Sequence, residues 1–392
     1  MVDSKDHFEE FEPHTLLKHA ILRMYAERWA RKLLLRRGAG TRLRIVDACA
    51  GRGGDEAGNK GSPLVAAVVA KGAAAQISEM RGEPVRIEVA AIEQKPSFYR
   101  ALQQNLEPFG DSVVALPGTL ADHIGKFERE FDEVPTLFFI DPFGLAPLRA
   151  DVVGRALAGR RNEVLLLFAD QAALRHNGAA ATAAPRELSP QASMFDDEPV
   201  PAATYEPAAS VAGRVRGAQR STEILDAAYG HLDWRAAVRD VPQQERRRAF
   251  IDLYVRLLHE LGAEYVLVIP IINDRFNLQY HLVHASHSVY GYTTMKEEVE
   301  RAWKAGTVGD TAATLMRFGA AVSNGEIERA VRTRFAGREV GWTEENGVQD
   351  YAMKHTPALK HQMPELKRRL ADLRVPGRGR EIRYKFPPLP KG

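Results

Sequence analysis

Cysteine is almost absent from this sequence, since Cys49 is the only one among 392 residues. A single thiol excludes an internal disulfide, and with it a zinc site of several cysteines or an iron–sulfur cluster held by this chain alone. Long apolar runs are also missing: no stretch approaches the ~18 apolar residues of a membrane-spanning helix, and the N-terminus lacks the apolar core of a signal peptide. We therefore expect a cytoplasmic protein with no membrane contact.

The sequence also lacks a large excess of charge of one sign, because the net charge of the whole chain is only +3. The charges are unevenly distributed, however, and residues 351–392 hold eleven Lys and Arg against three Asp and Glu. The apolar fraction of 45% is sufficient for a large core, and 392 residues favour two globular domains over one. These features indicate a soluble protein with a locally basic C-terminal part.

Apolar segments alternate with helical patterns through most of the chain. Continuous apolar strands indicate a parallel sheet that is covered by helices on both faces, and right-handed crossovers make such a sheet doubly wound. The fold class is therefore α/β. Strands are predicted at residues 43–46, 85–92, 112–116, 136–140 and 163–168, and helices at residues 14–37, 63–75, 97–106, 149–157 and 246–261.

The last two strands of this region distinguish between fold families. Residues 265–272 and 280–285 are strand-like, and the turn at 273–277 leaves no room for a crossover helix. The two strands must then form an antiparallel hairpin. A parallel sheet that ends in such a hairpin resembles the Rossmann-like sheet of class I methyltransferases, whereas a dinucleotide-dependent dehydrogenase would continue with further crossover helices.

Two segments depart from the alternating pattern. Residues 178–213 contain eleven Ala and five Pro with few bulky apolar side chains, which predicts a mobile insertion. The C-terminal part has helical patterns at 324–335, 345–354 and 364–373, a turn at 374–379 and a strand at 380–386. Three helices followed by a β element predict a winged-helix-like domain at 311–392, after a methyltransferase-like domain at 1–310.

The loop after the first strand has the composition of a ligand-binding loop. Asp47 ends the strand, and Ala48, Gly51 and Gly53 follow before the next helix. Glycine lets the backbone approach a ligand closely, and an acid such as Glu93 at the end of the second strand can accept hydrogen bonds from ribose hydroxyls. We predict that these residues bind S-adenosylmethionine. An ordinary turn and a surface glutamate remain the alternatives.

The fourth predicted strand runs into Asp141-Pro142-Phe143-Gly144. Open α/β sheets place their chemistry at such strand ends. Amino-methyltransferases have a D-P-P-Y type of motif there, which orients an exocyclic amine and stacks on a flipped base. We predict catalytic roles for Asp141, Pro142 and Phe143. A strand-terminating turn is the alternative, since Asp, Pro and Gly all favour turns.

Several basic residues are candidates for contact with nucleic acid or a protein partner. Lys18 and His19 lie on the first predicted helix, although a solvated helix face also explains them. The basic C-terminus suits phosphate contacts, while a solvated face or docking to an acidic partner protein are equal alternatives; the residues chosen are Arg368, Arg369, Arg378 and Arg380. No metal site is expected, because His281, His284 and His287 alternate between the faces of a strand.

The sequence is similar to the three-Cys-motif partner (TcmP) family. The match is carried by residues 14–19 (HTLLKH) with Trp29, 46–51 (VDACAG), 61–63 (GSP), 139–144 (FIDPFG), 230–234, and 280–286 (YHLVHAS) with Met295. The resemblance implies a class I methyltransferase-like fold, a C-terminal winged-helix-like domain, and a partner protein with a three-cysteine motif. Cys49 stands where the family tends to have an aromatic residue, and Arg52 where it often has proline.

Two functions from different classes follow. The first is an S-adenosylmethionine-dependent methyltransferase that acts on a base amine of DNA or RNA. The second is a non-catalytic partner that uses the same fold to present a substrate to the three-cysteine protein. A nuclease or another phosphoryl-transfer enzyme is less well supported, because the sequence shows neither a carboxylate cluster for metals nor a P-loop.

Overall fold

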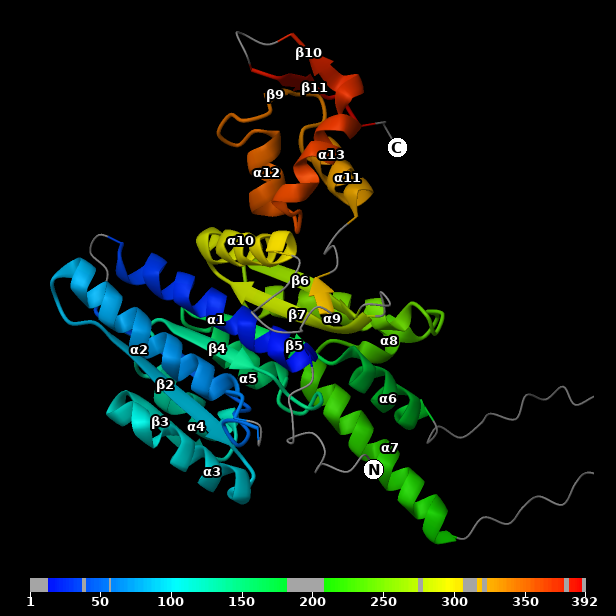
Figure 1. Cartoon of the computed structure of the whole chain (residues 1–392). Helices are drawn as coiled ribbons and strands as arrows, with labels where there is room; N and C mark the ends of the chain where they lie inside the picture. Colours follow the sequence, from blue (N-terminus) through cyan, green and yellow to red (C-terminus); the bar gives the residue numbers. More distant parts are fainter. Residues whose placement is uncertain are drawn as a thin grey trace, which may run out of the picture. The chain divides into compact units, whose positions relative to one another are not determined.

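The computed structural model describes residues 13–36, 40–55, 58–181, 208–273, 278–305, 316–318, 323–376 and 381–389 (Figure 1). The chain forms two compact units. The first comprises residues 1–141, 152–168 and 258–392, and the second comprises residues 142–151 and 169–257. The prediction placed a single boundary between residues 310 and 311. The observed division differs from it, because the second unit is inserted in the sequence between segments of the first.

An eight-stranded sheet with the order β3-β2-β1-β4-β5-β7-β6-β8 forms the centre of the first unit. Strands β1 to β5 pair in parallel, whereas β7 is antiparallel to both β5 and β6. The parallel sheet and the closing hairpin are therefore confirmed. The strands are β1 (Arg42–Asp47), β2 (Arg86–Glu93), β3 (Val113–Pro117), β4 (Thr136–Ile140), β5 (Glu163–Phe168), β6 (Tyr265–Asn273), β7 (Leu278–Ser286) and β8 (Met316–Phe318).

Strand β8 extends the sheet beyond the predicted domain boundary. Its three residues pair with the end of β6, so the large sheet takes residues from both sides of position 310. Every residue of β4 and β5 is buried, which explains why both strands are apolar except for Thr136 and Glu163 at their first positions.

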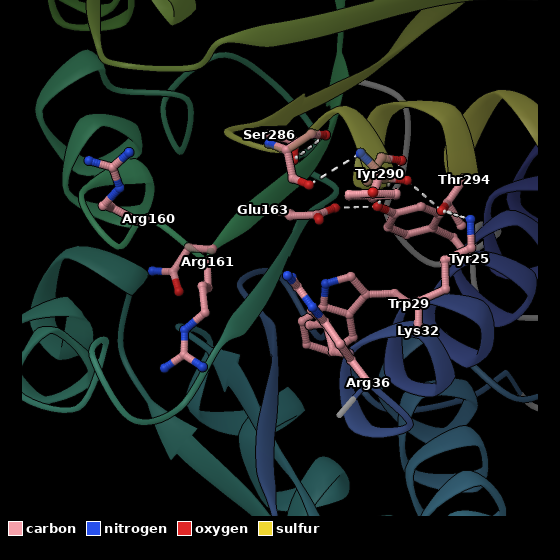
Figure 2. A pocket seen from close by; sticks show the side chains of 14 residues that line it. Tyr25, Trp29, Lys32, Arg36, Arg160, Arg161, Glu163, Ser286, Tyr290 and Thr294 are labelled. Atoms are coloured by element: carbon pink, nitrogen blue, oxygen red, sulfur yellow. Dashed lines mark hydrogen bonds between the residues drawn. The ribbon is translucent and has the colours of Figure 1, made fainter. Parts of the chain in front are cut away.

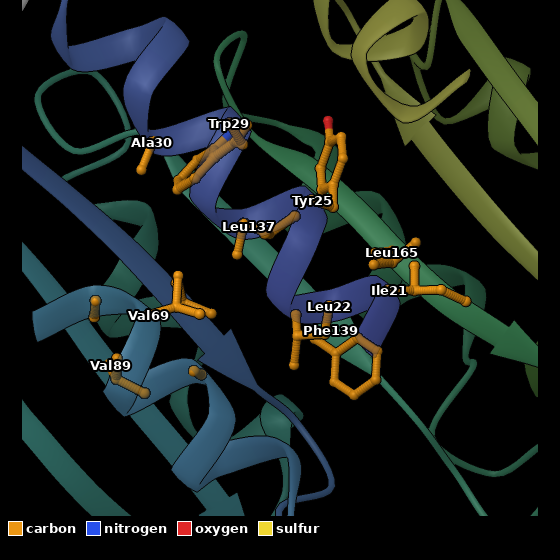
Figure 3. Close-up of a cluster of buried hydrophobic side chains, with 14 of the residues drawn as sticks. Ile21, Leu22, Tyr25, Trp29, Ala30, Val69, Val89, Leu137, Phe139 and Leu165 are labelled. Atoms are coloured by element: carbon orange, nitrogen blue, oxygen red, sulfur yellow. The ribbon is translucent and has the colours of Figure 1, made fainter. Parts of the chain in front are cut away.

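Helix α1 (Pro13–Leu34) covers one face of this sheet and contributes many buried side chains to the core. Figure 3 shows Ile21 and Leu22 of this helix close to Leu137, Phe139 and Leu165 of strands β4 and β5. The helix lies beside α2 (Ser62–Arg81) and α10 (Val289–Ala305). Proline is tolerated at the start of a helix, where its missing N–H has no helical partner.

Helix α3 (Pro96–Leu106) follows its predicted position within a few residues, and so does α5 (Ala150–Leu157), which bridges the two units in sequence. A short 3-10 helix at Glu107–Ser112 and helix α4 (Leu120–Glu128) lie on either side of β3 in the sequence. Helices α4 and α10 were not predicted. In α10 the buried residues Tyr292, Met295 and Val299 recur every three or four positions, which is the spacing of one helix face.

The second unit is helical and contains α6 (Asp170–Ala181), α7 (Ala208–Tyr229), α8 (Trp234–Val238) and most of α9 (Arg246–Glu260). Helices α6 and α7 pack together. The predicted mobile insertion at 178–213 is therefore wrong at both ends, because residues 178–181 and 208–213 are helical. Alanine is the strongest helix former, so an Ala-rich segment can be helical without bulky side chains. Residues 182–207 lie outside the described residues.

The C-terminal part has its own apolar core, which includes Ile327, Phe335, Trp342, Leu366 and Tyr384. The three helices and the last strand follow the prediction, whereas β9 was not predicted and β10 forms where a turn was predicted; the winged-helix assignment itself stays a prediction. The elements are α11 (Asn324–Arg334), α12 (Val348–His355), α13 (Met363–Arg369), β9 (Glu339–Gly341), β10 (Arg374–Val375) and β11 (Arg383–Lys385), with the antiparallel strand order β10-β11-β9.

None of the helices in the described parts of the chain combines the length and the apolar character that a membrane crossing demands.

Candidate functional site at the carboxyl edge of the sheet

Three acids predicted from the sequence meet at one edge of the sheet. Asp47 ends β1 and Glu93 ends β2, while Asp141 directly follows β4. Parallel pairing aligns these strand ends, because Asp47 lies opposite residues of both β2 and β4. The carboxyl edge of an open α/β sheet is where such folds bind ligands. The structure therefore brings together the predicted cofactor acids and the predicted catalytic acid.

The loop after β1 adopts conformations that require glycine. Gly51 has a φ of 63° and Gly53 a φ of 93°, both in the left-handed region that other residues rarely adopt. A Cβ at Gly53 would also lie only 3.3 Å from Asn105. The amide of Ala48 donates to the carbonyl of Phe139 at 2.9 Å, which fixes the start of the loop against β4.

The carboxylate of Asp47 is fully buried beneath this loop. Its Oδ1 accepts a hydrogen bond from the amide of Cys49 at 3.2 Å. Its Oδ2 makes no hydrogen bond of normal geometry within the described residues, although the nearby Ser62 side chain favours the ionised form. Burial outweighs these contacts and raises the pKa of Asp47 to about 7. The residue is therefore a buried acceptor with one oxygen to spare.

Glu93 fastens the glycine loop to β2. Its Oε2 accepts from the amide of Gly51 at 2.8 Å, and its Oε1 accepts from the amide of Lys95 at 2.7 Å. A carboxylate has about four acceptor positions, so each oxygen can accept one further hydrogen bond. These contacts give Glu93 a structural role at the loop, and its contact with ribose hydroxyls stays a prediction.

Asp141 forms an ion pair with Lys18 of α1. The Nζ atom of Lys18 lies 2.6 Å from Oδ2 and 2.9 Å from Oδ1 of Asp141, and 5.8 Å from the centre of the Tyr280 ring. Both partners are largely shielded from solvent, with side chains 13% and 17% exposed. The alternative of a solvated helix face is therefore wrong for Lys18.

His19 is buried as well. Burial lowers its pKa to about 4, which keeps the imidazole neutral near pH 7. A neutral imidazole in the interior is poorly suited to the phosphate contact that was predicted for it.

Pro142 and Phe143 belong to the second unit. Pro142 is buried, whereas Phe143 is 75% exposed. A single exposed aromatic side chain is ordinary on a protein surface, so the stacking role of Phe143 stays a prediction.

The basic residues of the C-terminal part are locally paired with acids. Arg368 lies 2.7 Å from Glu365. Arg369 lies 2.9 Å from Glu365 and 3.2 Å from Glu328. Arg378 and Arg380 lie outside the described residues. The two arginines that the structure describes are therefore neutralised by neighbouring carboxylates, and a phosphate would have to compete with these.

The sequence reasoning overlooked two parts of this edge. The loop after β3 approaches Glu93, because the amide of Gly118 donates to the Glu93 carbonyl at 3.0 Å. The glycine that directly follows a strand was the available signal. Tyr280 contributes the ring beside Lys18; it lies 139 positions after Asp141 in the sequence, and the motif at 280–286 gave no sign that its first residue reaches this edge.

No group of three or more potential metal ligands occurs among the residues that the structure describes. Among the three histidines considered in the sequence, His284 contacts Glu163 and Tyr25, and His287, just after β7, contacts the carbonyl of Leu157 at 2.6 Å.

The strand order, with an antiparallel β7 between β5 and β6, defines a Rossmann-like class I methyltransferase fold. Among solved structures, the chain is similar to a Legionella pneumophila protein of the DUF519 family, at 10% identity and a TM-score of 0.40, with 77% of this chain and 96% of that one covered.

Two methyltransferase structures are also similar. One is an O-methyltransferase from Bacillus cereus in complex with S-adenosylhomocysteine, at 11% identity and a TM-score of 0.33, with 71% and 83% covered. The other is the O-methyltransferase TomG from Streptomyces achromogenes in complex with S-adenosylmethionine, at 14% identity and a TM-score of 0.32, with 71% and 82% covered. No family model matches the chain, and no curated protein matches it.

Proposed function

We propose that this protein is an S-adenosylmethionine-dependent methyltransferase that acts in the cytoplasm. The observation that carries the proposal is the joint geometry of Asp47, Gly51 and Glu93. The carboxyl edge of the methyltransferase-type sheet carries three features: the buried Asp47 carboxylate with an unused oxygen, the glycine loop, and the second acid, Glu93. These groups fit an adenosine ligand that also carries an ammonium group.

Each residue of the loop has a separate task in cofactor binding. Glu93 would accept hydrogen bonds from the ribose hydroxyls, and Asp47 would stabilise the ammonium end. The backbone at Ala48, Gly51 and Gly53 would contact the methionine part, which only residues without bulky side chains permit. When bound, the cofactor supplies an electrophilic methyl group, and the chain has to hold and orient the acceptor.

Asp141 is suited to orient an amine. In the structure it already binds one, since both of its oxygens lie within hydrogen-bond distance of Lys18 Nζ. A substrate amine that replaced Lys18 would donate to the same carboxylate and to the Pro142 carbonyl, which fixes the direction of its lone pair. The exposed ring of Phe143 would stack on the base. We therefore infer that the substrate is a base amine of DNA or RNA.

A second function is favoured by the same ion pair. While Lys18 occupies Asp141, no amine can be oriented there, which suits a non-catalytic protein that presents a substrate to a three-cysteine-motif partner. Formation of S-adenosylhomocysteine distinguishes the two functions. Mass spectrometry of nucleosides from cells with and without the gene would identify the methylated base. If no nucleoside differs and purified protein with its partner forms no S-adenosylhomocysteine, the enzymatic function is wrong.

Cofactor affinity should depend on pH through Asp47. The pKa of its carboxyl is raised to about 7 by burial, so the group is neutral below pH 7 and ionised above it. Because the ammonium end binds the ionised form, affinity should rise by up to about tenfold per pH unit from pH 5.5 to 7 and then level off. Calorimetry across this range measures the slope. Asp47→Asn should remove it, and equal slopes in both proteins would contradict the role of Asp47.

The C-terminal arginines provide a test of nucleic acid contact. Replacement of Arg368, Arg369, Arg378 and Arg380 by glutamine should flatten the salt dependence of binding by up to ~4 units if all four contact phosphate. Glu365→Gln is a matched variant with the opposite expectation, because it releases Arg368 and Arg369 from their shared carboxylate and should strengthen binding. Fluorescence titrations over a range of salt measure both. Unchanged slopes, with a lost pull-down of the protein partner, would instead assign this surface to protein docking.

A further inference from the structure

A cavity of about 210 Å³ lies at the opposite edge of the sheet from the acids described above. It is formed where β5 begins at Glu163 and β7 ends at Ser286, a pair that the sheet register places side by side. Helices α1 and α10 complete the walls (Figure 2). Because β5 runs in the same direction as β1, this is the amino edge of the parallel strands, and none of the proposed methyltransferase residues lines it.

A buried carboxylate forms one wall of this cavity. Glu163 is only 5% exposed, and its Oε2 is contacted by the Tyr25 hydroxyl and by His284 Nε2, the latter at 2.8 Å. Burial raises the pKa of Tyr25 well above its ordinary value, so the phenol keeps its proton and donates it. The Tyr25 hydroxyl and the His284 imidazole thus hold this oxygen of the carboxyl group in place.

The second oxygen of Glu163 remains an acceptor. Its Oε1 makes no hydrogen bond within the described residues, and it sits against Gly291, where a Cβ atom would collide with it. Nδ1 of His284 is buried without a hydrogen-bond partner among the described residues. The arrangement holds the carboxyl group in place and leaves one of its oxygens for a ligand.

Unused donors come from α1 and the residues just after it. The side chain of Trp29 is 3% exposed, yet its indole N–H has no acceptor among the described residues. Buried indole groups usually find one. Arg36 forms no ion pair with any residue that the structure describes. Both side chains line the cavity and extend toward the strand that carries Glu163 (Figure 2).

Other cations near the cavity are less suitable. Lys32 Nζ donates to the Thr294 hydroxyl at 2.6 Å and lies 3.6 Å from Glu297. In Figure 2 the guanidinium groups of Arg160 and Arg161 point away from Glu163. The cavity thus offers one carboxylate oxygen on one side, and a guanidinium with an indole N–H on the other.

We propose that this cavity binds a free α-amino acid with an apolar or aromatic side chain. The ligand's ammonium group would donate to Glu163 Oε1, and its carboxylate would accept from Arg36 and from the indole N–H of Trp29. Leu33 and Tyr290, which also line the cavity, would contact the side chain. A volume of 210 Å³ is below the ~300–1,000 Å³ of pockets for larger ligands. A bare anion such as phosphate is disfavoured, because it would be repelled by Glu163.

Binding can be measured at Trp29 itself in the full-length protein. The chain has four tryptophans, so spectra of protein with ¹⁵N-labelled indole groups contain four signals, and Trp29→Phe identifies the one from Trp29. Titration with L-leucine, L-methionine and L-phenylalanine, each to 10 mM, should shift this signal saturably for at least one of them. If none of the three does so, the proposal is wrong.

Modified ligands test the two ends separately. N-acetyl-L-leucine lacks the ammonium group and L-leucinamide lacks the carboxylate, and each should bind at least about tenfold more weakly than L-leucine, provided that L-leucine is bound. Glu163→Gln should weaken L-leucine binding and reduce its advantage over the N-acetyl compound. Arg36→Gln should make L-leucine and L-leucinamide bind alike.

Arg160→Gln is the matched control for Arg36→Gln. Both arginines are exposed and line the cavity, but only Arg36 extends toward Glu163, so Arg160→Gln should leave the affinity unchanged. Because Arg36 is on the surface, we expect the Arg36→Gln protein to fold even if the Glu163→Gln protein does not. Equal losses in the two arginine variants, or none in either, would overturn the assignment. Because the readout needs no S-adenosylmethionine, failure of the methyltransferase proposal would not affect it.

Discussion

Replacement of Asp141 by alanine should lower the rate of methyl transfer more than ~10²-fold while cofactor affinity stays within a few-fold. Orientation of the acceptor relative to the reacting group accounts for a large part of many enzymatic accelerations, and Asp141 is the group that would orient the amine. Among the described residues its carboxylate is hydrogen-bonded to Lys18 of α1, so the hydrogen bonds that hold the glycine loop should be preserved. The rate is measured as S-adenosylhomocysteine formed on the base identified by nucleoside mass spectrometry.

Asp252 of α9 provides the control for this substitution. It is an exposed carboxylate in an ion pair with Arg248. Like Asp141 it is paired with a basic side chain, but it lies away from the end of β4. Asp252→Ala should leave both the rate and the cofactor affinity unchanged. An Asp141→Ala protein with near-normal turnover would reduce Asp141 to a residue of the turn after β4.

The second large effect is expected for Glu93→Ala. The substitution removes the acceptor for ribose hydroxyls and also the anchor of the Gly51 amide. A hydrogen bond to a charged group contributes about 1.5–3 kcal/mol, which corresponds to a roughly 10- to 100-fold weaker affinity for S-adenosylmethionine. Calorimetry with the purified protein measures this loss directly.

Glu107 is a suitable control for Glu93, because it is an exposed glutamate in the same unit. Glu107→Ala should bind the cofactor like the wild type. The melting temperature of Glu93→Ala separates loss of the loop anchor from loss of the ligand contact. Absence of cofactor binding in the wild-type protein would contradict the proposed function altogether.

Local features of the sequence were sufficient for most of the sheet. Strands such as β4 and β5 are apolar because both of their faces are covered, and this shows in a short window of sequence. The hairpin of β6 and β7 followed from the few residues between the strands. Asp47, Glu93 and Asp141 could be placed at one edge in advance, because parallel strands align their carboxyl ends.

Helix boundaries in the Ala-rich region were less predictable. The composition of residues 178–213 suggested a mobile segment, yet α6 ends and α7 begins within it. Alanine contributes helix propensity but little apolar surface, so composition alone does not reveal whether such a helix is stabilised. In the structure the two helices pack against each other, and that contact joins residues far apart in the sequence.

By itself, the sequence determined the sheet, its closing hairpin and the three acids at its carboxyl edge, since these depend on patterns within short stretches of chain. Only the tertiary structure decided what the acids and basic residues contact. Lys18 reaches Asp141 across 123 positions, and Glu163 reaches His284 across 121. No local pattern encodes such pairs, because they form only when the helix and the strands pack together and bury charges that must then find partners.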